Sequence, residues 1–339
     1  MSDTIRLTPS EVRTLAEGTL KHWGFGFDHV DAIAAMLATC QLDDCQSHGL
    51  FRLFMCIETA RQGRAALAAE PVLTLDESAV VRADAGGAIS LRAVQAGLPH
   101  LVERARRHGV AVLAVNHCYH FSALWPEIEQ LTAQGLAAFS MVPSHAWVAP
   151  AGGTRGALGT NPLAFGWPRP AAPEPFVFDF ATSAFARGEI ELYARAGRPL
   201  PEGVALDAAG QPTTDPQAAM AGAMCTFGGY KGSALSIMVE LMAGPLIGDL
   251  TSLDSMAHSQ GQPEAPCHGQ IIMAFDPERL SGGAQEESDA RAERLFAEIG
   301  AQGARLPSQR RFAARARNLE RGYVEISEAL HRDLLALRD

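Results

Sequence analysis

Cysteine is scarce in this sequence, and its spacing excludes two classes of protein. The 339 residues include six cysteines, none in a C-x-x-C pair. A disulfide-stapled scaffold or a two-part zinc module would need paired spacings, so we expect reduced, packed thiols. His117, Cys118 and His120 form the only patch with metal-ligand chemistry, and it has no matching second half. We therefore expect no metal site.

Positive charge and long apolar runs are also lacking. Lys and Arg number 28 against 38 Asp and Glu, which gives a net charge of −10. This balance argues against nucleic acid as a partner. No apolar run is long enough to span a bilayer, and residues 1–7 lack the apolar segment of a signal peptide. We expect a cytoplasmic globular protein with no membrane partner, of one large domain or two modest ones.

The usual nucleotide-binding fingerprints are absent as well. No G-x-G-x-x-G follows a predicted strand, and no G-x-x-x-x-G-K-[ST] occurs anywhere. The glycine-rich stretch 152–159, which leads into Thr160-Asn161-Pro162, fits neither pattern. The sequence therefore excludes a standard Rossmann fingerprint and a P-loop.

The most informative stretch present is Ser47-His48-Gly49, which we expect to open a helix. Ser47 would be its N-cap and His48 would lie in its first turn, where the helix dipole disfavours imidazolium. Arg52 lies four residues on, on the same predicted face, as a proton donor and a carboxylate clamp would need. A capping serine beside two solvated side chains remains the alternative.

Two acids precede this stretch in an unfavourable place. The first 65 residues read as a helical subdomain, and its second helix would end near Asp43 and Asp44, where the dipole disfavours negative charge. This violation of a local rule indicates a functional corner.

A strand–loop–helix–strand unit is predicted over residues 109–144. Its strands would span 110–115 and 136–142, and its helix 123–134 would have Ser122 as N-cap. The loop and helix start could bind an anionic ligand, although any α/β unit shows the same pattern.

Three later segments each allow more than one interpretation. The helix 233–248 is apolar nearly all round, which indicates burial in a core or at a subunit contact. Lys231 before it could bind a phosphate or ribose, or could be solvated. Residues 251–266 read as a mobile loop or lid. The arginine-rich stretch 306–317 would be a solvated face or would meet a 2′-phosphate.

Taken together, these motifs resemble the malate/L-lactate dehydrogenase-like NAD(P)H oxidoreductases. The matching segments are Ser47-His48-Gly49 with Arg52, Asn116-x-x-x-His120-Phe121, Gly159-Thr-Asn-Pro162, Asp179-x-Ala-Thr-Ser183 and Gly229-Tyr-Lys-Gly232. They occur in family order from residue 47 to about residue 310. Segments 120–124 and 186–189 are most similar to the Δ1-piperideine-2-carboxylate/Δ1-pyrroline-2-carboxylate reductases within this family.

The resemblance implies an α/β fold and a homodimer. Its NAD(P)H-binding domain would be non-Rossmann, with a largely antiparallel mixed sheet, flanked by helical N- and C-terminal parts. We expect a helical substrate and dimerisation part over 1–75, joined by C-terminal helices over 285–339. The cofactor domain would span 76–284, with a helical segment around 184–250.

The resemblance also implies the site residues. His48 would donate the proton, with Ser47 and Glu189 in a relay. The substrate would be held by Arg52, Thr160, Arg187 and Gly188. The dinucleotide would be held by His120, Phe121, Ser122, Ala123, Leu124, Phe178, Asp179, Phe180, Lys231, Pro307, Ser308, Gln309, Arg310 and Arg311.

Two departures from the family pattern refine the expected function. Many relatives that act on 2-oxo acids have lysine at the position of Glu189, and an acid there would raise the pKa of His48, which favours an imine over a ketone. The loop 307–310 lacks the glutamate often found in relatives, which favours NADPH over NADH. We therefore expect reduction of the two cyclic imine carboxylates to L-pipecolate and L-proline.

Three alternatives to this function stay open. The chain could be a dehydrogenase of malate, lactate, ureidoglycolate or other 2-oxo and 2-hydroxy acids within the same family. It could be a non-catalytic binding protein that has kept the fold. It could also be a metal-dependent enzyme built on His117, Cys118 and His120.

Overall fold

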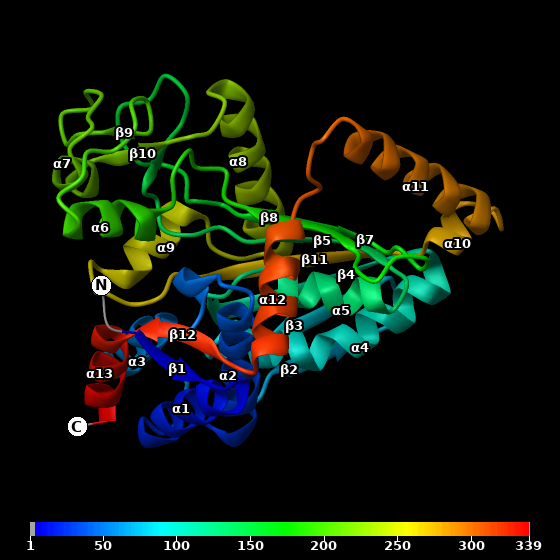
Figure 1. The fold of residues 1–339 in the computed structure, drawn as a ribbon, viewed down its shortest axis with the longest axis horizontal. Coiled ribbons are helices and arrows are strands. Elements are labelled where there is room, and N and C mark those ends of the chain that lie inside the picture. The colour runs from blue at the N-terminus through cyan, green and yellow to red at the C-terminus, as the bar shows by residue number, and fades with distance from the viewer. Residues whose placement is uncertain (1–3, 339) are drawn as a thin grey trace.

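A seven-stranded sheet forms the centre of the molecule (Figure 1). The structure is a computed structural model that describes residues 4–338. The strand order is β2-β3-β4-β11-β5-β7-β8, and every neighbouring pair is antiparallel except the parallel pair β3–β4. The strands are β2 (Val72–Leu75), β3 (Val80–Asp84), β4 (Val110–Tyr119), β5 (Ala137–Met141), β7 (Leu163–Trp167), β8 (Phe176–Phe180) and β11 (Cys267–Phe275). The predicted mixed, largely antiparallel sheet is confirmed.

Helices cover both faces of this sheet, and successive residues of a strand face opposite helix layers. On β5, Ala138 and Ser140 face α5 (Trp125–Ala133), whereas Phe139 and Met141 face α8 (Tyr230–Ala243). The first face is also covered by α4 (Ser90–His108), whose residues pack in the main core with β3 and β4. This alternation is the period-two pattern of a strand buried on both sides.

The two ends of the chain are joined. Strand β1 (Thr4–Leu7) pairs antiparallel with β12 (Val324–Ser327), and the indole N–H of Trp23 donates to the carbonyl of Leu337 at 2.7 Å. Around this pair lie α1 (Pro9–His22), α2 (Phe27–Leu42), α3 (Arg52–Arg61) and α13 (Glu328–Leu335). The predicted Thr8 capping box of α1 is confirmed.

A smaller sheet lies beside the large one, at the upper left in Figure 1. It orders as β6 (Val148–Ala149), β10 (Ala223–Cys225) and β9 (Ala205–Leu206), and it packs with α6 (Arg187–Arg195) and α7 (Pro216–Ala221) around its own core. The remaining helices are α9 (Ser252–Ser259), α10 (Pro277–Leu280), α11 (Gln285–Ala301) and α12 (Gln309–Arg321), with short 3₁₀ turns at Gln46–His48, Pro245–Ile247 and Ala336–Arg338.

The structure corrects several predicted boundaries. Strand β2 belongs to the large sheet through its pairing with β3, so the sheet begins before residue 76. Strand β4 continues to Tyr119, which shortens the predicted loop after it, because pairing with β11 satisfies its backbone. Residues 251–266 are not a mobile lid, since α9 lies within them and buries Ser252, Ser255 and Ser259.

Helix α8 begins earlier than predicted and is buried on one side only. Val239, Glu240 and Ala243 are buried, whereas Leu241 is 57% exposed. The other exposed apolar side chains of this region are Tyr230, Ile237, Met238, Leu246 and Leu253. Among residues 4–338, no single helix is long and apolar enough to cross a membrane. Helix α8 with the following 3₁₀ turn and α9 reach the required length and apolar composition only when counted together, and they are bent by 70° relative to each other.

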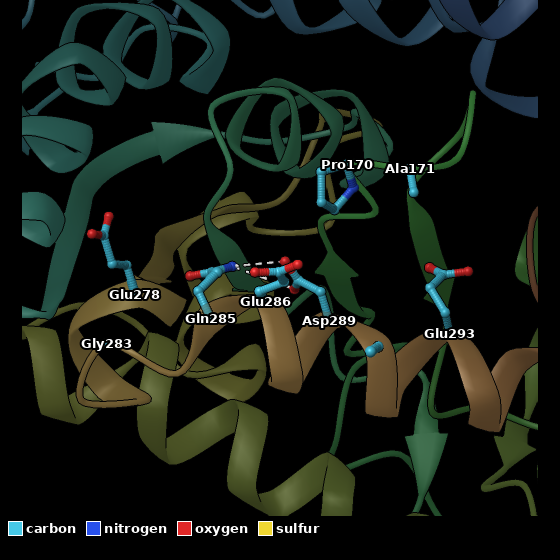
Figure 2. Close-up of a pocket in the computed structure, with 9 residues that line it drawn as sticks. Pro170, Ala171, Glu278, Gly283, Gln285, Glu286, Asp289 and Glu293 are labelled. Carbon is cyan, nitrogen blue, oxygen red and sulfur yellow. Dashed lines mark hydrogen bonds between the residues drawn. The ribbon is translucent and has the colours of Figure 1, made fainter.

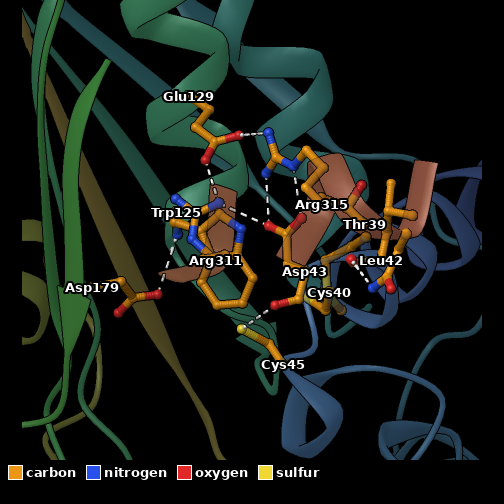
Figure 3. A network of polar contacts seen from close by, with 12 residues as sticks. Thr39, Cys40, Leu42, Asp43, Cys45, Trp125, Glu129, Asp179, Arg311 and Arg315 are labelled. Atoms are coloured by element: carbon orange, nitrogen blue, oxygen red, sulfur yellow. Dashed lines mark hydrogen bonds and ion pairs between the residues drawn. The ribbon is translucent and has the colours of Figure 1, made fainter. Parts of the chain in front are cut away.

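A buried ion-pair network explains the two acids after α2 (Figure 3). Asp43 accepts hydrogen bonds from Arg311 at 2.8 Å and from Arg315 at 2.7 Å, and both arginines also pair with Glu129 of α5. The network therefore ties α2, α5 and α12 together. Asp43, the unfavourable acid at the end of α2, therefore has a structural role. The predicted arginine-rich stretch is not a solvated face, and its Arg311 and Arg315 are not free to bind a phosphate.

We predict that Asp43→Asn lowers the free energy of unfolding by about 3 kcal/mol, because it leaves the buried guanidinium of Arg311 and the half-buried one of Arg315 short of a carboxylate. Urea denaturation of the whole chain measures this change. Asp44→Asn is the matched control: Asp44 pairs with Arg317 on the surface, and its loss should cost less than about 1 kcal/mol. Equal effects from the two variants would contradict the role of Asp43.

Candidate active site

Ser47, His48 and Arg52 come together, but not as the start of one helix. Residues 46–48 form a 3₁₀ turn, and α3 begins at Arg52 with Phe51 as its N-cap residue. Ser47 is therefore not an N-cap, because Gly49 breaks the helical path between the turn and α3. Within this corner, Ser47 Oγ lies 3.0 Å from His48 Nδ1, and Arg52 Nη2 lies 3.5 Å from His48 Nε2.

These two contacts allow two positions for the proton of His48. With its hydrogen on Nδ1, the ring donates to Ser47 Oγ, and Nε2 accepts from the Arg52 guanidinium, which can only donate. With its hydrogen on Nε2, the ring accepts at Nδ1 from the Ser47 hydroxyl, and Nε2–H faces the pocket, as the proton donor implied by the family resemblance requires.

The pKa of His48 is lowered to about 3, first by burial and second by the charge of Arg52. The expectation from the helix dipole has the right direction but the wrong cause, and the expectation that Glu189 raises this pKa is not met. Arg52 forms no salt bridge among residues 4–338, although the charge of Glu191 acts on it from farther away. Its side chain is half-buried, and its Nε is buried without a hydrogen-bond partner. Arg52 is thus a cation available to an anionic ligand.

Glu189 does not contact His48 within this chain. Its carboxylate accepts from the backbone N–H of Ala186 at 3.2 Å, at the start of α6. Because the acid caps its own helix and is exposed, it does not offset the low pKa of His48, and the predicted relay is not formed among the described residues. Arg187 begins α6 beside Gly188 and lies 4.3 Å from the ring centre of Trp147.

A second buried network holds the loop that carries Thr160. Glu240 of α8 accepts from the backbone N–H groups of Gly159 at 3.0 Å and of Ser252 at 2.8 Å, and from the Asn161 amide at 2.7 Å. Thr160 itself accepts through its carbonyl from Thr182. One carboxylate of α8 therefore fixes the residues on either side of the predicted substrate ligand.

The segment His120–Leu124 is buried between β4 and α5, as its position in the predicted site requires. Ser122 Oγ lies 3.1 Å from His120 Nε2, and the ring centre of His268 lies 5.7 Å from that of His120. Burial lowers the pKa of His120, and the charges of His268, His48 and Arg52 lower it further. His120 therefore lies near the Ser47–His48–Arg52 corner.

Asp179 corrects the predicted anion site at the start of α5. Its carboxylate accepts from the backbone N–H of Leu124 at 2.8 Å and of Trp125 at 3.2 Å. It therefore fills the helix start that we assigned to Ser122 as cap and to an anionic ligand. Burial raises the pKa of Asp179 to about 6. Its role in holding a dinucleotide would be indirect, through the position of segment 120–124.

The start of α8 suits a dinucleotide. Gly229 has φ +61° and precedes the helix, and a Cβ at Gly228 or Gly229 would meet nothing within 4 Å. Backbone N–H groups can therefore be approached closely there. Lys231 is exposed in the first turn, and the ring centres of Phe180 and Phe227 lie 5.8 Å apart nearby. A cation beside an accessible helix start and exposed aromatic rings fits a phosphate and an adenine.

The C-terminal loop contributes less than predicted. Helix α12 already begins at Gln309, whose side chain accepts from the backbone N–H of Leu306. Arg311 is only 8% exposed and is committed to Asp43 and Glu129, so it is not free for a phosphate. Of the two arginines, Arg310 alone is exposed, and Pro307 and Ser308 lead into it.

Sequence reasoning missed His145, Trp147 and His268. His145 is buried, its Nε2 has no hydrogen-bond partner, and its ring centre lies 5.0 Å from that of Trp147. Burial lowers its pKa to about 4, with further lowering by His268, Arg187 and His258. The sequence offered one indication of His145: it follows a predicted strand directly, and loops in that position often carry functional side chains.

Two other places carry no comparable chemistry. The three residues 117, 118 and 120 do not converge: His117 pairs with Asp84, whereas Cys118 donates to the His268 carbonyl. No group of three metal-ligating side chains occurs among residues 4–338. A surface hollow of about 800 Å³ lies between α11 and Pro170 (Figure 2). It is lined by Glu278, Glu286, Asp289 and Glu293, which would repel an anionic substrate.

Comparison with known proteins defines the class. The malate/L-lactate dehydrogenase family matches residues 7–335, so the chain belongs to this oxidoreductase family, and a nicotinamide cofactor is implied. A Δ1-pyrroline-2-carboxylate/Δ1-piperideine-2-carboxylate reductase of Pseudomonas aeruginosa is 56% identical over 333 residues, 98% of this chain and 99% of the relative. Δ1-Pyrroline-2-carboxylate reductase 1 of Burkholderia ambifaria is 53% identical over 98% of this chain and 97% of its own.

A solved structure agrees with these relatives. The crystal structure of Δ1-piperideine-2-carboxylate reductase from Pseudomonas syringae superposes with a TM-score of 0.92 at 38% identity, covering 98% of this chain and 99% of that one. The family predicted from the sequence motifs is thus confirmed, over nearly the whole chain.

We predict that His48 stays neutral from pH 8 down to pH 5. Its folded pKa of about 3 lies below the unfolded value of about 6.5. The unfolded chain therefore binds a proton first, and this group's contribution to stability is lost as the pH falls from 6.5 toward 3. Imidazole ¹⁵N NMR measures the titration, and a midpoint near 6.5 would contradict the described environment.

Proposed function

We propose that this protein reduces Δ1-piperideine-2-carboxylate and Δ1-pyrroline-2-carboxylate to L-pipecolate and L-proline with NADPH. The observation that carries the proposal is the half-buried guanidinium of Arg52 beside His48 Nε2, which has no salt bridge among residues 4–338. A ligand for this corner needs a carboxylate next to a polar ring atom. A cyclic 2-carboxy imine has both on adjacent atoms, and the named activities of the relatives agree.

The substrate carboxylate would bind Arg52 by charge-assisted hydrogen bonds. His48 would then face the ring nitrogen. Thr160, held by the Glu240 network, and Arg187 with Gly188 at the start of α6 would form the rest of the pocket. The chain's part in the reaction is to fix the ring and keep water from it.

The bound cofactor would supply a hydride to C2 of the ring. Segment 120–124 and the strand end Phe178–Phe180 would hold it in a non-Rossmann cofactor domain, with Lys231 and the loop 307–310 at its phosphates. Exposed Arg310, with no acid in the loop 307–310, supports NADPH over NADH.

A second copy of the chain is the occupant that we propose for the exposed face of α8. The apolar side chains there include Ile237, Met238 and Leu241, and the buried face of the same helix carries Glu240. Covering this face in a homodimer would fix the helix that positions the Thr160 loop.

The rival function is oxidation or reduction of an open-chain 2-hydroxy or 2-oxo acid by the same fold. A panel of both cyclic imines, pyruvate, oxaloacetate, malate, lactate and ureidoglycolate, each with NADPH or NADP⁺ and with NADH or NAD⁺, separates the two by absorbance at 340 nm. We expect turnover of the imines, faster with NADPH. Turnover of open-chain acids alone would overturn the proposal.

We also predict that Arg52→Ala raises the KM for the imine carboxylates by about 10²-fold, since a charged hydrogen-bonded pair is lost, while NADPH binding is unchanged. Initial-rate kinetics and a fluorescence titration of NADPH measure the two effects. Arg61→Ala on the same helix is the control, because its guanidinium lies over Trp23 at the other end of α3. An unchanged KM would remove Arg52 from the carboxylate site.

A further inference from the structure

Two buried histidines near the proposed site each keep a ring nitrogen that the chain does not use. The first is His268 of β11, which is 1% exposed. Its Nδ1 lies 2.9 Å from the carbonyl oxygen of Gly269, which can only accept, so Nδ1 carries the hydrogen. Burial lowers the pKa of this imidazole, which favours the neutral ring. Nε2 then holds a lone pair, and it forms no hydrogen bond among residues 4–338.

The second histidine is His145, which follows β5 and is 4% exposed. Its Nε2 is buried without a hydrogen-bond partner, and Trp147 packs edge-on against its ring. The guanidinium of Arg187 lies over the indole of Trp147, so this stack joins His145 to the start of α6. The charge of His268 lowers the pKa of His145, so the two imidazoles are close to each other. Leaving a buried polar atom unmet is costly, so its retention indicates a partner that arrives with a ligand.

These rings lie beside the corner of Arg52 and His48. His120 links His268 to this corner, because the ring centres of His120 and His268 are 5.7 Å apart. The charges of His48 and Arg52 reach His120 and lower its pKa. The backbone N–H of His120 donates to the carbonyl of Pro266 at 2.9 Å, which fixes the end of β4 against the segment before β11. The unused nitrogens are therefore next to the place where a nicotinamide would have to meet the substrate.

The chemistry of the two nitrogens selects a ligand group. Nε2 of His268 needs a hydrogen-bond donor, which excludes the substrate carboxylate, since a carboxylate only accepts and would bind Arg52. A primary carboxamide carries an N–H donor and a carbonyl acceptor on one carbon. A nicotinamide has such a group on the carbon next to the one that releases hydride. It can meet both nitrogens at once, because the neutral ring of His145 can carry its hydrogen on Nε2.

Resting on the proposed function, we propose that His268 and His145 bind the carboxamide of the nicotinamide. Nε2 of His268 accepts from its NH2 group, and Nε2–H of His145 donates to its carbonyl. Two contacts to one planar group stop the ring from turning about its bond to the ribose, which keeps the hydride-bearing carbon on the substrate. Neither contact involves the phosphates or the adenine, which the start of α8 would hold.

The reduced 3-acetylpyridine analogue of NADPH tests this assignment, because a methyl group replaces the NH2 group and the carbonyl is kept. By calorimetry without substrate, we expect the wild type to bind NADPH at least about tenfold more tightly than the analogue, since the analogue leaves Nε2 of His268 unmet. In His268→Ala this ratio should fall to about one. In His145→Ala both ligands should bind more weakly and the ratio should persist, because both have the carbonyl.

His258→Ala is the matched control. This histidine of α9 is exposed, and its Nε2 lies 3.4 Å from the hydroxyl of Tyr119, so its loss should leave both affinities as in the wild type. Equal affinities for NADPH and the analogue in the wild type would overturn the inference. A ratio that survives in His268→Ala would do the same, since it would show that only water meets Nε2 of His268.

Imidazole ¹⁵N NMR of the wild type decides the case if His268→Ala does not fold. The Nε2 resonance of His268 should move upfield as NADPH binds, because its lone pair accepts a hydrogen bond, and should move less with the analogue. Equal shifts with the two ligands would overturn the inference. The proposed function fails separately, if the wild type binds NADPH but reduces neither imine.

Discussion

Arg52 is a half-buried guanidinium that forms no salt bridge among residues 4–338, and the organisation of the site depends on that fact. Holding a cation partly away from solvent without a carboxylate in contact is costly, so the surrounding fold must keep it in place. Burial lowers the pKa of the neighbouring His48, and the charge of Arg52 lowers it further. A cation for an anionic ligand and a histidine of low pKa thus lie in one corner.

Buried carboxylates elsewhere hold the walls around this corner. Asp43 joins α2, which leads into the corner, to α12 and α5. Asp179 fixes the start of α5 and with it the segment His120–Leu124. Glu240 fixes the loop with Thr160. Each of these acids accepts several hydrogen bonds from other parts of the chain. Acids that resemble ligands in the sequence therefore stabilise the fold, and the charge left for a ligand in this corner is the positive charge of Arg52.

The sequence predicted the elements whose signals are local. The Thr8 capping box, the strand at 137–141 and the mixed sheet follow from short-range pattern, and the joint motifs identified the family. Two failures come from distant residues: Asp179 replaces Ser122 as the cap of α5, and Asp43 binds Arg311 from across the fold. Such pairings are long-range, so no spacing rule reveals them. Two others are local: Gly49 separates Ser47 from α3, and Glu189, which the family resemblance placed in a relay with His48, accepts from Ala186 at the start of its own helix.

The most direct measurement is a crystal structure of the enzyme with NADPH and pyrrole-2-carboxylate, a planar analogue of the cyclic imine carboxylates. We expect the carboxylate on the Arg52 guanidinium and the ring nitrogen within hydrogen-bonding distance of His48 Nε2, with Ser47 Oγ still at Nδ1. A ligand bound with its ring nitrogen turned away from His48, or a carboxylate held by another residue, would contradict the central claim.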